Sequence, residues 1–203
     1  MKRSLSAAIA LALTNCATPT EYRVDAAHPV RTITVAREVS EPKEMTFVAF
    51  SEMMGMGLAG GLGGAVGAGL AAGTTFSRGG EPAFQIGQSV PNAMIAEIRK
   101  SGKFAVKENG PADAELQLKV TAYGFYQAGM FARRVRPIIG LEAKLVRADG
   151  AVLWQHRRAV TQLTKETPAI LPEKIRDDPA TGAEALRVAA GICARNAVAS
   201  LRQ

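Results

Sequence analysis

Hydrophobic and polar residues alternate strictly in two long stretches in the second half of the chain. In the first stretch apolar residues take every second position, at Ala114, Leu116, Leu118, Val120 and Ala122. The second stretch repeats the pattern at Ile139, Leu141, Ala143 and Leu145. Successive side chains of a strand point to opposite faces, so both stretches predict strands of a sheet with one wet face.

A hairpin turn is predicted after the second stretch. Asp149 and Gly150 tolerate the positive φ that such a turn requires, and Val152, Trp154 and His156 continue the pattern of a returning strand. Shorter strands are predicted at residues 31–37, 45–50 and 104–106, where β-branched or apolar residues lie between chain breakers. The three long strands should therefore form a meander.

Helical spacing predicts two helices. In the first, Met94, Ile95 and Ile98 share one face, Ser89 is the candidate N-cap, Pro91 lies in the first turn, and Gly102 ends the helix. The second opens at Thr181 or Gly182, after an irregular stretch at residues 164–181. Its predicted buried face consists of Leu186, Ala190, Cys193, Ala197 and Leu201.

The order of these elements predicts an α+β fold. Strands that are wet on one side need cover only on the other, so we expect an antiparallel or mixed sheet with two helices packed on one face. Residues 31–203 are predicted as one domain, with a glycine-rich apolar insertion at 53–76. Residues 16–30, which contain Pro19 and Pro29, are predicted as a tether.

The start of the chain has the marks of an export signal. Lys2 and Arg3 precede an apolar run at 5–13, and this run is too short to span a bilayer. Leu13, Thr14, Asn15 and Cys16 follow it. The start of the chain is therefore predicted to direct export.

This order of residues resembles a bacterial lipoprotein signal. Leu13 and Thr14 match the family's pattern, whereas Asn15 stands where the family usually has Gly, Ala or Ser. The resemblance implies that residues 1–15 are removed as a signal peptide and that Cys16 is lipidated. Several acyl chains on this cysteine would hold the protein to a membrane, whereas one chain alone would hold it only marginally. Ala17 is not aspartate, which by the family's sorting rule implies the outer membrane, facing the periplasm. The alternative is an ordinary secretory signal.

The apolar insertion is rich in glycine and contains overlapping G-x-x-x-G spacings. They are carried by Gly57 and Gly61, Gly60 and Gly64, Gly63 and Gly67, and Gly69 and Gly73. Such faces let helices pack closely in a membrane, whereas each glycine costs about 0.8 to 1 kcal/mol in a helix in water. The segment is either a membrane-inserting or oligomerising glycine zipper or a mobile apolar loop. It is similar in composition to segments of conjugative surface-exclusion lipoproteins, which implies a membrane-associated homo-oligomer.

A second resemblance covers residues 90–155. It is carried by Ser101-Gly102-Lys103-Phe104, Ala112-Asp113-Ala114-Glu115-Leu116 and Ala148-Asp149-Gly150-Ala151. These phrases and the order of elements resemble the small periplasmic α/β sandwich of lipopolysaccharide-transport, curli-secretion and synthase-activator lipoproteins. The resemblance implies a non-catalytic role beside an envelope protein partner, with no binding residue transferable.

The charge is positive and modest. The formal net charge of +7 falls to +5 once Lys2 and Arg3 leave with the signal. A basic protein at a membrane meets anionic headgroups and glycans, and the 5% aromatic content does not fit a nucleic-acid partner. Arg133, Arg134 and Arg136 could grip headgroup phosphates or an acidic glycan, or they form an ordinary basic hairpin tip.

Motifs for catalysis, metal binding or a cofactor do not occur in the sequence. His28 and His156 have no ligand spacing, and Cys193 has no partner if Cys16 is lipidated. We therefore expect no enzymatic activity, no metal and no cofactor. The sequence favours an accessory or assembly protein of a cell-envelope complex. The alternative is a periplasmic carrier of a lipid or glycan.

Overall fold

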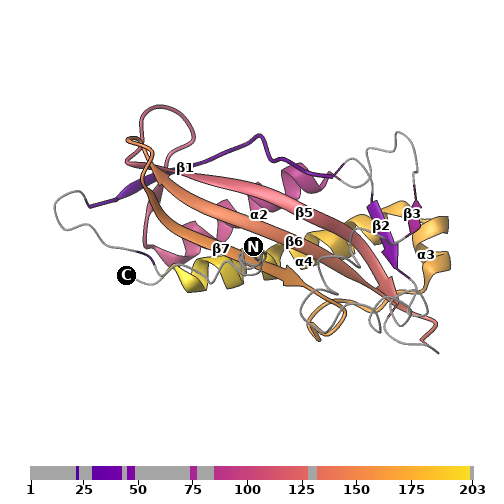
Figure 1. Ribbon diagram of the computed structural model, residues 1–203. Helices are drawn as coiled ribbons and strands as arrows, with labels where there is room; N and C mark the ends of the chain where they lie inside the picture. Colours follow the sequence, from indigo (N-terminus) through magenta and orange to yellow (C-terminus); the bar gives the residue numbers. More distant parts are fainter. Residues whose placement is uncertain are drawn as a thin grey trace, which may run out of the picture.

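The computed structural model describes residues 22, 29–42, 45–48, 74–76, 85–127 and 132–201. These residues form a mixed sheet of seven strands and three helices, α2 to α4. Three long strands cross the molecule side by side, and α2 and α4 lie together behind them (Figure 1). The α+β fold class predicted from the sequence is confirmed.

The three long strands form the predicted antiparallel meander. They are β5 (Ala114–Gln127), β6 (Val135–Arg147) and β7 (Val152–Val160). Leu116 pairs with Leu145, and Leu145 pairs with Trp154, so these three buried side chains form one row across the inner face. Outer-face positions such as Gln117 are exposed. The period of two therefore separates a wet face from a core face, as the sequence predicts.

Two short strands lie end to end along the other side of β5, and both run parallel to it. β1 (Thr32–Val35) pairs with the start of β5, and β2 (Met45–Val48) pairs with its last residues. β4 (Ala105–Val106) pairs with β1 and runs parallel to it, and β3 (Thr74–Phe76) pairs with β2 and runs antiparallel to it. These pairings make the sheet mixed.

Two helices bury the inner face of the sheet. α2 (Ile86–Ser101) and α4 (Pro179–Ser200) pack against each other, and α4 also packs against β6 and β7. Trp154 and Met94 are fully buried between the layers. The predicted buried face of the last helix is confirmed, because all five of its residues lie in the core: Leu186, Ala190, Cys193, Ala197 and Leu201.

The first helix begins earlier than the sequence predicts. Gln85, not Ser89, precedes its first turn, and its side chain forms no cap hydrogen bond. Ile86 and Val90 are both buried, so their packing extends the helix past the position where local capping signals would start it. The predicted end is correct. Gly102 adopts the left-handed conformation, with φ of 66°, which glycine takes without strain.

The last helix also begins earlier than predicted, at Pro179. Asp178 caps it by accepting a hydrogen bond from the Ala180 N–H at 3.1 Å and another from the Thr181 hydroxyl at 2.8 Å. The stretch at 164–181, predicted to be irregular, contains the short helix α3 (Pro172–Asp177), which has Pro172 in its first turn. None of its residues is buried, so no apolar periodicity marks this helix in the sequence.

The predicted domain limits stay predictions. The signal peptide, Cys16 and residues 53–73 of the glycine-rich insertion lie outside the described residues, while its last three residues form β3. Among the described residues, no helix is both long enough and apolar enough to cross a bilayer.

Gly124 leaves room for the backbone of β2 to lie against β5. Its φ is +153°, and a Cβ built at this position would lie 1.8 Å from the backbone oxygen of Thr46 in β2. β2 pairs with β5 at this residue, through Thr46 and Gly124. The attachment of β2 to the sheet therefore requires glycine at position 124.

We predict that Gly124→Ala lowers the free energy of unfolding by about 3 kcal/mol or more, because neither backbone can move without breaking the β2–β5 pairing. Urea denaturation followed by circular dichroism measures this. Gly191→Ala in α4 is the matched control, since a Cβ there meets nothing within 4 Å. The control should be stabilised by about 0.5 to 1 kcal/mol. Equal stability of the two variants would contradict the prediction.

Candidate functional site

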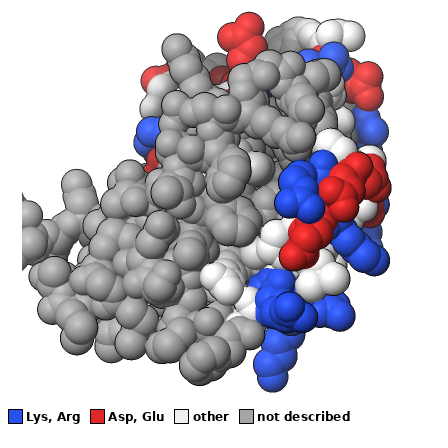
Figure 2. All heavy atoms as spheres, turned by 90° about the vertical axis from the view of Figure 1, so that its right-hand side faces the viewer, with Lys and Arg blue, Asp and Glu red and all other residues white. Residues whose placement is uncertain are grey.

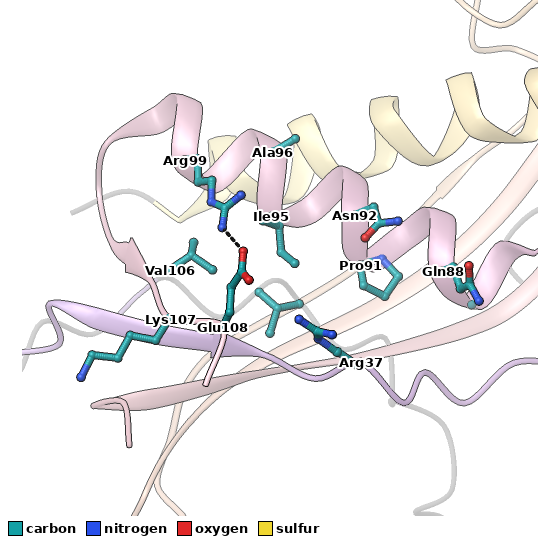
Figure 3. Close-up of a pocket in the computed structure, with 12 residues that line it drawn as sticks. Arg37, Gln88, Pro91, Asn92, Ile95, Ala96, Arg99, Val106, Lys107 and Glu108 are labelled. Atoms are coloured by element: carbon teal, nitrogen blue, oxygen red, sulfur yellow. Dashed lines mark hydrogen bonds and ion pairs between the residues drawn. The ribbon is translucent and has the colours of Figure 1, made fainter. Parts of the chain in front are cut away.

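A groove of about 580 Å³ runs between α2 and the short strands β1 and β4. The exposed stripe of α2 beside its buried face forms one wall, with Gln88, Asn92 and Arg99 along it. Residues at and after the ends of β1 and β4 form the other wall (Figure 3). The groove therefore depends on two parts of the chain that are far apart in the sequence, residues 35–37 and residues 87–108.

The floor of the groove is apolar. It consists of Val35 at the end of β1, Pro91 and Ile95 of α2, and Val106 of β4. Val35 and Pro91 are buried, whereas Ile95 and Val106 are partly exposed. A ligand could therefore cover aliphatic surface here while its polar groups meet the rim.

The rim carries more positive than negative charge. Arg37 follows β1, Lys107 and Glu108 follow β4, and Arg99 reaches across from α2 to bind Glu108, with 2.7 Å between Nη2 and Oε1 (Figure 3). Lys107 points away from the middle of the groove and donates to the Pro111 carbonyl at 2.8 Å (Figure 3). Three cations thus stand against one carboxylate in this part of the groove.

Glu108 is held ionised. The hydrogen bond from Arg99 lowers its pKa most, and the charges of Arg99 and Arg37 lower it further. Both partners of the Arg99–Glu108 pair are more than half exposed, so solvent screens the pair and a ligand anion can compete for Arg99. The carboxylate therefore orients Arg99 without neutralising the rim.

A second carboxylate lies at the other end of the groove. A Cβ built on Gly87, in the first turn of α2, would lie 3.0 Å from Oε2 of Glu41. The carboxylate thus occupies the N-terminal end of α2, where a negative charge is favoured by the helix dipole. The positive part of the groove is consequently its opposite end, around Arg99.

The groove offers hydrogen-bond donors to a ligand. Guanidinium and ammonium groups and the amides of Gln88 and Asn92 can donate hydrogen bonds to an anionic or hydroxylated ligand above the apolar floor. Among the described residues there is no group of three or more His, Cys, Asp or Glu side chains that could hold a metal ion.

The predicted arginine cluster lies at the start of β6. Arg136 is the second residue of that strand and not part of the loop, a small correction to the predicted boundary. Its guanidinium donates to the carbonyls of Thr164, Lys165 and Thr167, and Arg134 donates to the Ala169 carbonyl at 3.1 Å. These two side chains fasten the segment before α3. Arg133 is exposed.

The other sequence-predicted site residues lie outside the described residues. They are Cys16 and the glycines Gly57, Gly61, Gly64, Gly67, Gly69 and Gly73. Their roles stay predictions.

Cys193 is buried in α4, where its thiol lies 3.7 Å from the Ile139 carbonyl. Burial raises the pKa of this thiol to about 12, so it stays protonated and unreactive at neutral pH. Its burial on a helix agrees with the interpretation from the sequence.

His156 belongs to the core of the sheet. Its ring stacks on Trp154, with 5.5 Å between centroids, and Nδ1 lies 2.9 Å from the Ser200 hydroxyl. Burial, and secondly the charge of Arg158, lower its pKa below the ordinary value. The histidine is therefore neutral in the folded protein.

Sequence reasoning missed the groove. Gln88, Asn92 and Arg99 recur at helical spacing beside the buried stripe of α2, and this is a signal that could have marked one wall. Arg37 and Lys107 lie in segments whose pairing no local pattern reveals. The second wall could not have been found in the sequence.

No family model matches the chain, and no curated protein matches it. Several solved structures are similar to it, including the following two. Protein XCC0632 from Xanthomonas campestris, of family DUF330, is 20% identical over 89% of this chain and 90% of its own, with a TM-score of 0.48. A PelC dodecamer from Paraburkholderia phytofirmans is 13% identical over 92% of this chain and 97% of its own, with a TM-score of 0.46. We therefore infer function from this chain's own residues.

We predict that the protein loses stability as the pH falls below about 6.5, the ordinary pKa of histidine, because the unfolded chain then binds a proton that folded His156 resists. The loss should not exceed about 1.4 kcal/mol per pH unit for this one group. Urea denaturation between pH 7.5 and about 5 measures it. His156→Gln should flatten this dependence, whereas His28→Gln, the matched control, should retain it. Unchanged dependence in His156→Gln would refute the assignment.

Proposed function

We propose that this protein is a lipid-anchored, non-catalytic accessory protein of the bacterial cell envelope. It is held at the outer membrane, faces the periplasm and positions its domain beside a partner in an envelope complex. The observation that carries the proposal is Cys16, which follows Leu13 and Thr14 behind a charged and then apolar start.

The α+β domain suits such a role. Its core is filled by large side chains, and its described residues expose a wet sheet face and an open groove. A tethered domain gains effective concentration near its partner without new contacts. The anchor therefore supplies proximity, and the groove between α2 and β4 is the surface on which we expect the partner to bind.

A second candidate is a periplasmic carrier of a lipid or glycan. The groove favours it, because a volume of about 580 Å³ lies within the range of small-molecule sites and its apolar floor is bordered by hydrogen-bond donors. Extraction of the purified protein with organic solvent distinguishes the two. A carrier would release a bound lipid or glycan, and an assembly protein would release none.

The glycine-rich segment would add contact between copies of the chain or with the bilayer. We assign this role to Gly57, Gly61, Gly64, Gly67, Gly69 and Gly73, whose small side chains permit close helix packing. Arg133 would add contact with anionic headgroups or glycans.

We predict that Cys16→Ala abolishes metabolic labelling with palmitate and moves the protein from the membrane pellet to the soluble fraction, because the acyl chains are then missing. Cys193→Ala is the matched control and should keep both label and location, since its thiol is buried. If Cys16→Ala stays in the pellet, the same variant without residues 55–73 shows whether the glycine-rich segment holds it. Wild-type protein that takes up no palmitate would contradict the proposal.

We predict that a photo-crosslinking residue at Asn92, on the rim of the groove, gives discrete products in intact cells. The matched control is Gln117, exposed on the wet face of the sheet. Mass spectrometry identifies each product as an envelope protein, a glycan, a lipid or a second copy of the chain. Deletion of residues 55–73 should remove bands between copies only. Absence of products specific to Asn92 would exclude the groove as the binding surface.

A further inference from the structure

The tether is attached to the domain at Tyr22. Its ring meets Phe104 edge to face, with 5.9 Å between centroids and 81° between planes, and Tyr22 packs against the hydrophobic core. Phe104 is only 5% exposed and directly precedes β4. Burial also raises the pKa of the Tyr22 hydroxyl. The tether therefore has a fixed exit point on the domain surface.

That exit point lies at a firmly held end of the sheet, where β1 and β5 begin. Asp113 accepts hydrogen bonds from the N–H groups of Arg31 and Thr32, at 2.9 and 2.8 Å. Lys103, beside Phe104, donates to the carbonyl of Leu201 at the end of α4. These contacts join the start of β1, the start of β5, the end of α2 and the end of α4. We name this end of the domain the β1 end.

The number of residues between Cys16 and Tyr22 limits how far this end can be from the lipid. Cys16 and Tyr22 are six residues apart, which spans about 22 Å at most. β5 alone has 14 residues and extends about 45 Å from the β1 end toward α3. A domain fixed at Tyr22 therefore cannot stand on its α3 end, with the β1 end about 45 Å from the lipid, unless the Tyr22–Phe104 contact breaks.

We propose that the β1 end is the membrane-facing surface of the domain and contacts anionic lipid headgroups. This inference rests on the proposed lipidation of Cys16. The Tyr22–Phe104 contact sets the orientation, and α3 and the start of β6 point away from the lipid. In this orientation Arg133 faces the periplasm, so of the two contacts proposed for it only the one with acidic glycans remains.

The charges of the β1 end suit a lipid surface. Among the described residues it carries six cations, Arg31, Arg99, Lys100, Lys103, Lys107 and Arg147, and four carboxylates, Glu108, Asp113, Glu115 and Asp149. Glu108 and Asp149 are each paired with an arginine, at 2.7 Å. The Asp113 carboxylate accepts hydrogen bonds from backbone N–H groups. Cations such as Lys100 therefore remain for headgroup phosphates.

Charge does not by itself select this end. Figure 2 views the molecule from the α3 side, and there the basic and acidic side chains of the described residues adjoin one another. Lys174 and Arg176 stand beside Glu173 and Asp177 in α3. The discriminating feature is the place where the tether joins the domain.

The test places a donor fluorophore at either end of the full-length lipidated protein, in vesicles whose headgroups carry an acceptor. Lys107→Cys reports the β1 end and Lys174→Cys, its matched control, reports α3. Labelling is selective because Cys193 is buried with a pKa of about 12 and the sulfur of Cys16 is alkylated. We expect energy transfer to the headgroup acceptor to be at least about threefold higher from a donor on Lys107→Cys than from one on Lys174→Cys, since the two ends lie about 45 Å apart.

Two further variants test the contact itself. Tyr22→Ala should reduce the difference between the two positions, because the free tether lengthens, whereas Tyr22→Phe keeps the ring and should retain it. A Gly/Ser insert after Ala17 lengthens the tether without touching the domain, and it should lower transfer from Lys107→Cys. Vesicles containing phosphatidylglycerol should give higher transfer from this position than vesicles of phosphatidylcholine alone.

Each outcome decides the inference. Equal transfer from both positions in the wild-type background, or a difference that survives both Tyr22→Ala and the Gly/Ser insert, overturns it. If energy transfer does not depend on phosphatidylglycerol, the proposed contact with anionic headgroups is wrong, whereas the proposed orientation of the domain still stands. Palmitate labelling of the same preparations separates these results from failure of the proposed function, because an unlabelled protein lacks the anchor.

Discussion

Burial of one face of the β5–β6–β7 meander beneath α2 and α4 is the constraint on which the structure depends. The part of α4 that faces the sheet and α2 consists largely of alanine. Four alanines there are fully buried: Ala189, Ala190, Ala194 and Ala197. Small side chains let the helix backbone approach its neighbours and leave room for large ones such as Trp154. The outer face stays wet, so two helices suffice to complete the core.

The surfaces proposed for function follow from the edge of this arrangement. β1 and β4 are short and leave the exposed stripe of α2 uncovered, and the groove is the space between them. Phe104, in the turn from α2 to β4, receives Tyr22 at the same edge. The groove and the exit of the tether thus share one structural support, so a domain held to the membrane at Tyr22 would carry the positive end of its groove near the lipid.

Elements with a strong local pattern were predictable, and those formed by packing were not. The alternation from Ala114 and the turn at Gly150 depend only on neighbouring residues. The start of α2 depends on burial of Ile86 against the core, which overrides the capping preference of Ser89. α3 buries no residue and therefore has no periodic signal. The sequence shows Arg134 and Arg136 only as charges in a loop. In the structure, both donate hydrogen bonds to backbone carbonyls of another segment.

The sequence by itself determined the fold class and the candidate anchor, because side-chain alternation, helical spacing and the order of residues before Cys16 are local properties. Only the tertiary structure decided that β1 and β2 lie end to end along β5, with Gly124 admitting the backbone of Thr46. It alone brought Arg37, Arg99 and Glu108 to one groove and Tyr22 to Phe104. Contacts between distant segments depend on how the whole core is filled, and no local pattern encodes them.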